Sequence, residues 1–396
     1  MTLPNVLDIP KWVDVRKEKK IKLPVHGQGV FLFTNMNSME DVSFLILTED
    51  GYDGLFVWFT QKQIGIKKIS TDEIFMDKRN KEGLIPVKGA YYWFSLDSQN
   101  QRLYAGIGEA RLENIRYEYH LSEDNKSFLE SLVKIKFDKT KNFRPLKILR
   151  DPITDKVPLY VKDTNELSMK DIACNSFIPN ANLTPVCQQL YNTISGKNFV
   201  LNTPDFPDFS EAIEYSIRTP ECWCYEKLKK KSTEFNDTPN IYATYLRITM
   251  GQNNGESPGI PYVMEIWPCG HYSPIHNHSG ANAIIRVLSG EIHVTLYPFL
   301  SYGDDLIKPF GSADFKKEEI TWISTNLNQI HRLKNIKKDK VCITIQCYMY
   351  DRDDSVHYDY FDYIDDDDKI EHYEPDSDME FMKFKKIIKC EWKNKK

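Results

Sequence analysis

The chain has 396 residues, a formal net charge of −5 and a hydrophobic fraction of 41%. This length predicts two domains, and no run of roughly 18–20 apolar residues is present that would cross a membrane. Acidic and basic residues are interspersed without a basic stripe, which excludes the usual footprint of a nucleic-acid binder. We therefore expect a soluble protein with neither nucleic acid nor membrane as a partner.

The first twenty residues and the cysteines indicate the compartment. MTLPNVLDIPKWVDVRKEKK has no apolar core behind a basic flank, so it predicts no secretory signal. The eight cysteines form no CxxC pairs of the kind that structural zinc sites use. They are typical of reduced thiols, and we expect a cytoplasmic protein.

Residues 25–137 alternate short apolar runs with turn clusters. The runs are GVFLFT, VSFLILT, GLFVWFT, YYWFSL, LYAGIG, IRYEYHL and SLVKIKF. This spacing predicts an all-β sandwich over residues 1–150, and nothing in it indicates a role. Its aromatic residues, such as Trp58, Trp93 and Tyr104, are expected mainly in the core, although an aromatic surface that recognises a ligand or partner chain is the alternative.

The middle of the chain changes character twice. Residues 151–179 are irregular and polar, which predicts a linker. From residue 180 to 233, LTPVCQQLYNTIS, FSEAIEYSIR and PECWCYEKLKKKS have apolar positions at helical spacing. We expect a small helical lead-in to the second domain.

Strand patterns return beyond Asn240 and continue to Tyr350. YATYLRITM, PYVMEIWP, NAIIRVLSG, EIHVTLYPFL, EEITWIST and KVCITIQCYMY predict a second β domain, a barrel, within residues 180–396. The acidic stretch after Asp351 and the basic end that follows it are expected to form a solvated charged segment rather than a docking site.

Three histidines stand out in this second domain. GHYSPIHNHSG places His276 and His278 two residues apart, where the side chains of a strand share one face. A barrel could return His331, in NQIHRLKN, to the same place, giving three nitrogen donors for one divalent ion. An HxH pair alone is equally compatible with a hydrogen-bonded polar pair.

The segments around these histidines resemble the two characteristic segments of the cupin superfamily. Where most cupins place a glutamate ligand soon after HxH, this chain has Gly280, Ala281, Asn282 and Ala283. Three histidines without the acid resemble the thiol dioxygenases, and the cysteine dioxygenase family in particular. LTPVCQQLYNTISG, YATYLR, GHYSPIHNH, IHRLKN and TIQCYMY occur in that family's order, over about residues 180–360.

The resemblance implies a cupin barrel that binds Fe(2+) and oxidises a small thiol with O2. It implies the following roles: metal ligands His276, His278 and His331; substrate-binding residues Arg247 and Tyr245; the catalytic Tyr348; and, supporting it from the same strand face, Gln346 and Thr344. The planar guanidinium of an arginine suits a substrate carboxylate. From the residues alone, a surface arginine is the favoured interpretation of Arg247, and only the resemblance reverses it. For Tyr245, a half-buried strand aromatic is an equal alternative.

The family's usual substrate is L-cysteine, and the product is cysteine sulfinate, in cysteine catabolism and taurine biosynthesis. The chain departs from the family at Ala283, where many members have a cysteine that is linked to the tyrosine, and at Gln346, usually a histidine. These departures leave 3-mercaptopropionate or another small thiol open as the substrate. They also leave open a metal-binding cupin without turnover that acts as a binding protein, or a zinc or manganese enzyme.

The first domain carries only a faint resemblance. DGYDGLFVWF and YWFSLDSQNQRLYAGIG look like a β-sandwich module found near farnesoic-acid methyltransferase-like sequences. No activity is implied by it.

Overall fold

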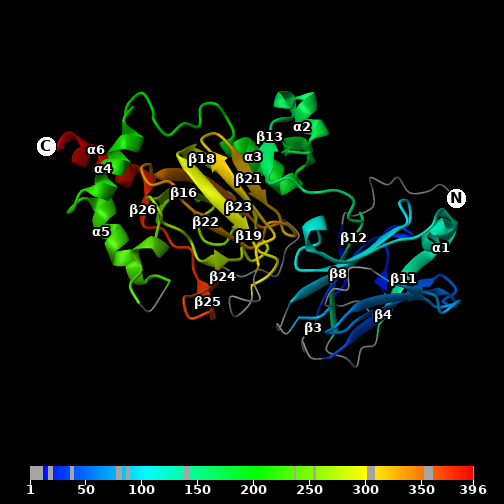
Figure 1. The fold of residues 1–396 in the computed structure, drawn as a ribbon. Coiled ribbons are helices and arrows are strands. Elements are labelled where there is room, and N and C mark those ends of the chain that lie inside the picture. Colours follow the sequence, from blue (N-terminus) through cyan, green and yellow to red (C-terminus); the bar gives the residue numbers. More distant parts are fainter. Residues whose placement is uncertain are drawn as a thin grey trace. The chain divides into compact units, whose positions relative to one another are not determined.

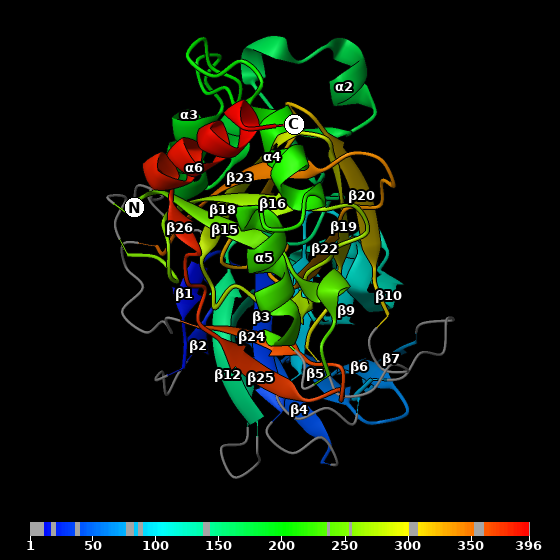
Figure 2. The same cartoon turned by 90° about the vertical axis from the view of Figure 1, so that its left-hand side faces the viewer.

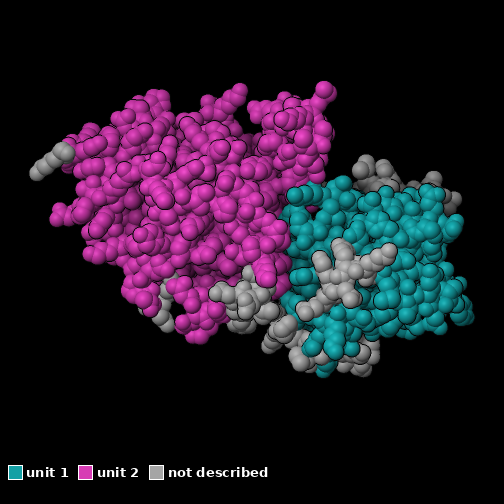
Figure 3. Space-filling model, in the orientation of Figure 1, with its two compact units in different colours: residues 1–156 teal, residues 157–396 magenta. Residues whose placement is uncertain are grey.

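The chain forms two compact units, residues 1–156 and residues 157–396, which Figure 3 colours separately. The computed structural model describes residues 12–16, 21–35, 40–76, 83–85, 90–137, 143–235, 238–252, 256–300, 308–351 and 360–395. The expectation about a leader at the start of the chain falls outside these residues. Among the residues described, no helix combines the length and apolar character needed to cross a membrane.

The first unit is the predicted β-sandwich of two antiparallel sheets (Figure 1). One sheet has the order β1 (Trp12–Asp14), β12 (Phe143–Leu149), β3 (Gln28–Asn35), β8 (Tyr91–Asp97), β9 (Arg102–Ile107) and β10 (Ile115–His120). The other has the order β2 (Ile21–Lys22), β11 (Leu132–Phe137), β4 (Val42–Thr48), β5 (Gly54–Phe59), β6 (Ile64–Lys68) and β7 (Ile74–Phe75). The short helix α1 (Lys126–Glu130) precedes β11.

Aromatic side chains fill the space between these two sheets. Phe33 of β3 contacts Phe44 and Phe59 of the opposite sheet edge-to-face, at ring-centroid distances of 5.6 and 5.1 Å. Trp93 is fully buried and lies over Gly106 on the next strand, where an added Cβ would come within 2.2 Å of the indole. The aromatic runs of the sequence therefore build a core, as expected for Trp93, whereas Trp58 is only half-buried.

The second unit is a barrel built from two further sheets. The larger sheet has the order β14 (Phe177–Pro179), β13 (Tyr160–Lys162), β21 (Ile320–Ile323), β18 (Asn282–Ser289), β23 (Cys342–Met349), β16 (Tyr262–Trp267), β15 (Leu246–Gly251) and β26 (Met379–Glu380). The smaller sheet has the order β20 (Gly311–Lys316), β19 (Glu291–Leu296), β22 (His331–Lys334), β17 (Ile275–His276), β24 (Phe361–Ile364) and β25 (Ile370–Tyr373). The prediction of a β-sandwich followed by a cupin-type barrel is confirmed.

Helices cover the outer face of the larger sheet, and strand alternation decides which residues they cover. The helices of this unit are α2 (Met169–Ala173), α3 (Pro185–Ile194), α4 (Phe209–Arg218), α5 (Trp223–Lys230) and α6 (Phe381–Lys393). Figure 2 shows α4, α5 and α6 side by side over β15 and β16, where they bury Leu246 and Ile266. Neighbouring positions such as Arg247 and Glu265 therefore lie on the inner face, where the polar site is built.

Two expectations about segment boundaries need correction. Residues 157–179, expected within a linker, belong to the second unit, because β13 pairs with both β14 and β21. The end of the chain, expected to be a solvated segment, contributes β24, β25, β26 and α6 to the barrel, although residues 352–359 lie outside the described part. Phe384 and Ile388, four residues apart on α6, are fully buried, and this apolar stripe holds the charged segment in place.

Candidate metal centre

Two strands and the segments next to them bring the predicted histidines together. His276 ends the short strand β17, and its Cα partner in the antiparallel ladder is His331, the first residue of β22. His278 lies two residues beyond β17, and its Nδ1 lies 2.8 Å from the carbonyl oxygen of Gln329, just before β22. The sequence pair and the distant histidine thus meet at the smaller sheet, although His278 lies beyond the end of the strand that the spacing suggested.

The three rings point one nitrogen each toward a common centre. One ring nitrogen of each histidine lies within 4.8 Å of those of the other two, and the ring centroids are 4.5–4.8 Å apart. The Nδ1 atoms of His276 and His278 face the carbonyl oxygens of Pro274 and Gln329, so each Nδ1 carries the proton. Their Nε2 atoms are then lone-pair donors, the form that coordinates a metal.

Burial keeps these imidazoles neutral. It lowers the pKa of His276 to about 4, and it lowers the pKa values of His278 and His331 well below their ordinary range, with the neighbouring histidines adding to the effect. The Nε2 atoms of His278 and His331 are buried and have no hydrogen-bond partner in the described part of the protein. Buried polar atoms without a partner are costly, and a divalent metal ion held by three neutral nitrogens would satisfy both of them.

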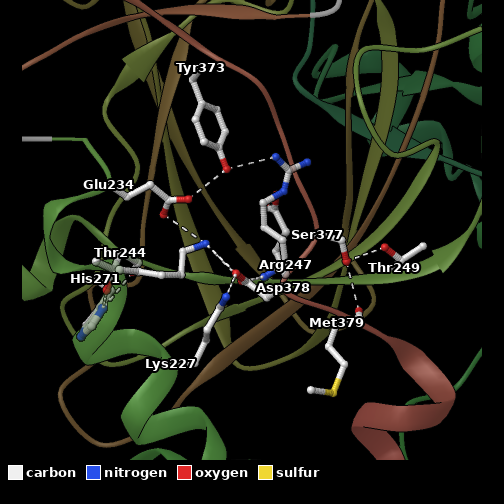
Figure 4. Close-up of polar contacts among 12 residues, drawn as sticks. Lys227, Glu234, Thr244, Arg247, Thr249, His271, Tyr373, Ser377, Asp378 and Met379 are labelled. Carbon is white, nitrogen blue, oxygen red and sulfur yellow. Dashed lines mark hydrogen bonds and ion pairs between the residues drawn. The ribbon is translucent and has the colours of Figure 1, made fainter.

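Arg247 lies on the inner face of β15, on the opposite sheet, and is 1% exposed. Its Nε is 3.4 Å from Oε1 of Glu265, its cross-strand neighbour on β16, and one terminal nitrogen is 3.5 Å from the Tyr373 hydroxyl. Figure 4 shows the guanidinium turned toward Tyr373, which also reaches Glu234. Burial alone would lower the pKa of Arg247, but Tyr373 and Glu265 outweigh it, so the guanidinium stays charged.

Tyr348 stands beside the histidines on the inner face of β23. Its ring is parallel to that of His278, with centroids 6.0 Å apart. Its hydroxyl donates to Oε1 of Gln346, whose Nε2 donates to Glu265, and Thr344 accepts a further hydrogen bond from the same amide at 3.4 Å. The three residues expected on one strand face therefore form one polar network next to the histidines.

The two departures from the family pattern have defined places in this network. Ala283 is the Cα partner of Tyr348 across the ladder, so the position that would carry the cysteine directly faces the tyrosine. Cys347 points to the other face, toward the carbonyls of Leu190 and Ile284, and cannot replace that cysteine. Gln346 connects Tyr348 to Glu265, a contact that links two strands.

Tyr245 precedes β15 and is 6% exposed. Its ring is parallel to that of Trp267 at a centroid distance of 4.2 Å and to that of Phe235 at 6.1 Å. Burial raises the pKa of its hydroxyl well above the ordinary value. A contact between Tyr245 and a substrate stays a prediction. In the structure the Tyr245 ring packs into an aromatic cluster with Trp267 and Phe235.

Several residues at this centre were not predicted from the sequence. Phe361 of β24 covers the histidines, with its ring 5.0 Å from that of His278 and 6.1 Å from that of Tyr348. Glu265 could have been recognised as an acid inside the apolar strand YVMEIW, on the same alternation as Trp267. Phe361 and Tyr373 lie in the segment interpreted as solvated, and no local pattern there indicates contact with the site.

The barrel thus carries three converging histidines that could hold a metal ion. No family model matches the chain. Over 108 residues the chain is 24% identical to the protein named "Cysteine dioxygenase type 1" from Danio rerio, a match that covers 26% of this chain and 50% of that protein. The chain thus spans about half the length of this curated relative.

Two solved structures with a local similarity to this chain are the following. One is oxalate oxidase in complex with the substrate analogue glycolate, at 21% identity and a TM-score of 0.21, covering 28% of this chain and 52% of that one. Another is a cupin superfamily protein from Desulfitobacterium hafniense, at 14% identity and a TM-score of 0.19, covering 27% of this chain and 79% of that one.

Proposed function

We propose that the second unit is an iron(II)-dependent thiol dioxygenase that oxidises L-cysteine to cysteine sulfinate with O2. The observation that carries the proposal is the cluster of three neutral histidines next to a buried, charged Arg247. Neutral ligands suit Fe(2+) because they leave its charge uncompensated and leave coordination positions open. When bound, iron(II) supplies a redox-active centre that binds both a thiolate and O2.

The side chains around the histidines hold and orient the substrate. The terminal nitrogens of Arg247 would bind the carboxylate of cysteine, because Glu265 engages only the Nε edge of the guanidinium. Tyr348 donates its own proton to Gln346, so its hydroxyl oxygen is available as an acceptor on the side of the histidines. Phe361 lies over the histidine rings and excludes water from that side.

The overall reaction needs no further cofactor. Both oxygen atoms of O2 end on the sulfur, which supplies the electrons and becomes a sulfinic acid. The small-molecule thiol and O2 would then be the partners of this unit. The proposal would place the protein in cytoplasmic cysteine catabolism, toward taurine biosynthesis.

A second candidate follows from Ala283 and Gln346. Because Ala283 faces Tyr348, the tyrosine cannot form the thioether at that position that many family members have. A site of this kind could favour 3-mercaptopropionate or another small thiol, or could bind a metal without turnover and serve as a binding or interaction protein.

O2 uptake separates these candidates. Full-length protein loaded with iron(II) is given L-cysteine, 3-mercaptopropionate or cysteamine, with His276→Ala as the inactive control and His293→Ala as a matched control, since His293 lies on the adjoining strand β19 and bonds Asp314 instead. We expect L-cysteine to be consumed with one sulfinate per O2 by the wild type and by His293→Ala only. Bound iron without O2 uptake from any thiol would favour the binding protein.

A further inference from the structure

Glu265 is a buried carboxyl group to which the proposed reaction assigns no role. Its side chain is 5% exposed, and it faces the inside of the barrel from the middle of β16. One oxygen lies 3.4 Å from the Arg247 Nε, and the other accepts a hydrogen bond from Gln346, which in turn accepts from Tyr348. One carboxyl group thus connects the arginine predicted to bind substrate with the tyrosine beside the histidines.

The charges near Glu265 are already balanced before a substrate enters. The charged and titratable groups that act on Glu265 come from several elements: Arg247 on β15, Lys231 in the 3-10 helix Lys231–Thr233, Asp378 before β26, Tyr348 on β23 and Tyr245 before β15. Lys231 is engaged elsewhere, with Asp378 at 3.1 Å and Glu234 at 3.0 Å. Figure 4 shows Lys227 directed at the same Asp378, which leaves Arg247 as the cation that pairs with Glu265.

A substrate carboxylate would therefore share Arg247 with a carboxylate that is already there. Two carboxylates around one guanidinium in a water-poor site repel each other, and such a pair readily keeps one proton. Burial already raises the pKa of Glu265 to about 7, even though Arg247 acts to lower it. Glu265 consequently needs little further perturbation to take up a proton near neutral pH.

We propose that Glu265 is a specificity-determining residue that takes up one proton from solvent when a carboxylate-bearing thiol binds at Arg247. This inference rests on the proposed function. It adds a charge rule, by which we mean that a thiol with a carboxylate binds together with one proton and a thiol without a carboxylate does not. The proton converts the Glu265 carboxylate to a carboxylic acid, and no bond in the substrate changes. An aminothiol without a carboxylate, such as cysteamine, leaves the Arg247–Glu265 pair intact and needs no such proton.

The rule has a defined pH dependence. Below about pH 6, Glu265 already carries its proton, and the two kinds of thiol bind with the same proton balance. Above its pKa of about 7, each pH unit weakens the binding of the carboxylate-bearing thiol up to about tenfold relative to cysteamine. Thiol and amine ionisation are common to L-cysteine and cysteamine, so the difference between the two ligands isolates the carboxylate.

Anaerobic titration calorimetry of the iron-loaded, full-length protein tests this directly. L-Cysteine and cysteamine are titrated at pH 6 and pH 8 in buffers of different ionisation enthalpy, which reports the protons exchanged on binding. At pH 8, we expect the binding of L-cysteine to be accompanied by the uptake of about one proton more than the binding of cysteamine. At pH 6, we expect the two ligands to bind with the same proton exchange. Equal proton exchange at pH 8 in the wild type would overturn the inference, whatever the behaviour of any variant.

Two variants assign the proton to its residue. Glu265→Gln should abolish the difference between the ligands, whereas Glu234→Gln, a buried carboxyl group paired with Lys231, should retain it. If Glu234→Gln lost the difference in proton uptake between the two ligands and Glu265→Gln kept it, the proton would belong to Glu234 and the proposal would be wrong. If L-cysteine is oxidised with equal proton exchange, the charge rule alone fails; if neither thiol binds, the proposed function fails with it.

Discussion

Replacing Arg247 by Gln tests how the charged pair supports both stability and binding. Arg247 and Glu265 are 1% and 5% exposed, so the variant leaves a buried carboxyl group without its cation. Breaking a buried ion pair in this way costs about 3–5 kcal/mol of the free energy of unfolding. The loss of charge-assisted hydrogen bonds to a substrate carboxylate should cost a further ~1.5–3 kcal/mol of binding, or roughly 10–150-fold in KM for L-cysteine.

The loss of stability should depend on pH in a defined direction. A carboxyl group whose pKa is raised in the folded state keeps its full contribution below the unfolded value and loses it as the pH rises through the folded value. Burial puts that folded pKa near 7 for Glu265, and removal of Arg247 should raise it further. Arg247→Gln should therefore be destabilised by up to about 1.4 kcal/mol more at pH 8 than at pH 6, relative to the wild type.

Urea unfolding at the two pH values and steady-state kinetics measure these effects. The double variant Arg247→Gln, Glu265→Gln removes both charges and should recover much of the lost stability at pH 8. KM for cysteamine should change far less than KM for L-cysteine, because cysteamine has no carboxylate. Equal changes for both thiols, or the same destabilisation at both pH values, would refute the reasoning.

Three further predictions concern the fold and the histidine cluster. Gly106→Ala should destabilise the sandwich by more than about 2 kcal/mol, because its Cβ would come within 2.2 Å of the Trp93 ring; Gly196→Ala, with nothing within 4 Å, is the control in urea unfolding. Phe384→Ala should cost about 3–5 kcal/mol through the loss of buried contacts under α6, whereas Met382→Ala, 74% exposed, should cost little, and equal midpoints would contradict this account. Metal-free protein should lose stability as the pH falls from 6.5 toward 4, because the three buried histidines have lowered pKa values and the unfolded chain takes up their protons first; a flat thermal midpoint over that range would contradict their burial as neutral rings.

The residues of the histidine cluster could be proposed from the sequence because the patterns that mark them are short motifs or strand alternation. The HxH spacing brings His276 and His278 close together even though the strand ends at His276, and alternation in CITIQCYM put Thr344, Gln346 and Tyr348 together. The same alternation, applied to YVMEIW, would have placed Glu265 inside the barrel with Arg247 opposite. The signal for Glu265 is thus an acidic residue inside an otherwise apolar strand.

Other features could not be predicted from local patterns. Phe361 reaches the histidines because β24 pairs with β17, which lies far away in the sequence. The acidic residues around β24 suggested a solvated segment, although Phe361 and Tyr363 of this strand are buried. Residues 157–179 looked like a linker because their strands are three residues long and gain stability only by pairing with β21. In both cases tertiary pairing outweighs composition.

The central claim is that the three histidines hold iron for a reaction that places both atoms of O2 on a thiol sulfur. Turnover of L-cysteine by the iron-loaded wild type under isotopically labelled O2, followed by mass spectrometry of the product, tests it most directly. The account predicts cysteine sulfinate with both oxygen atoms labelled, and no product from His331→Ala. A product with one labelled oxygen, or cystine with no labelled sulfinate, would contradict it.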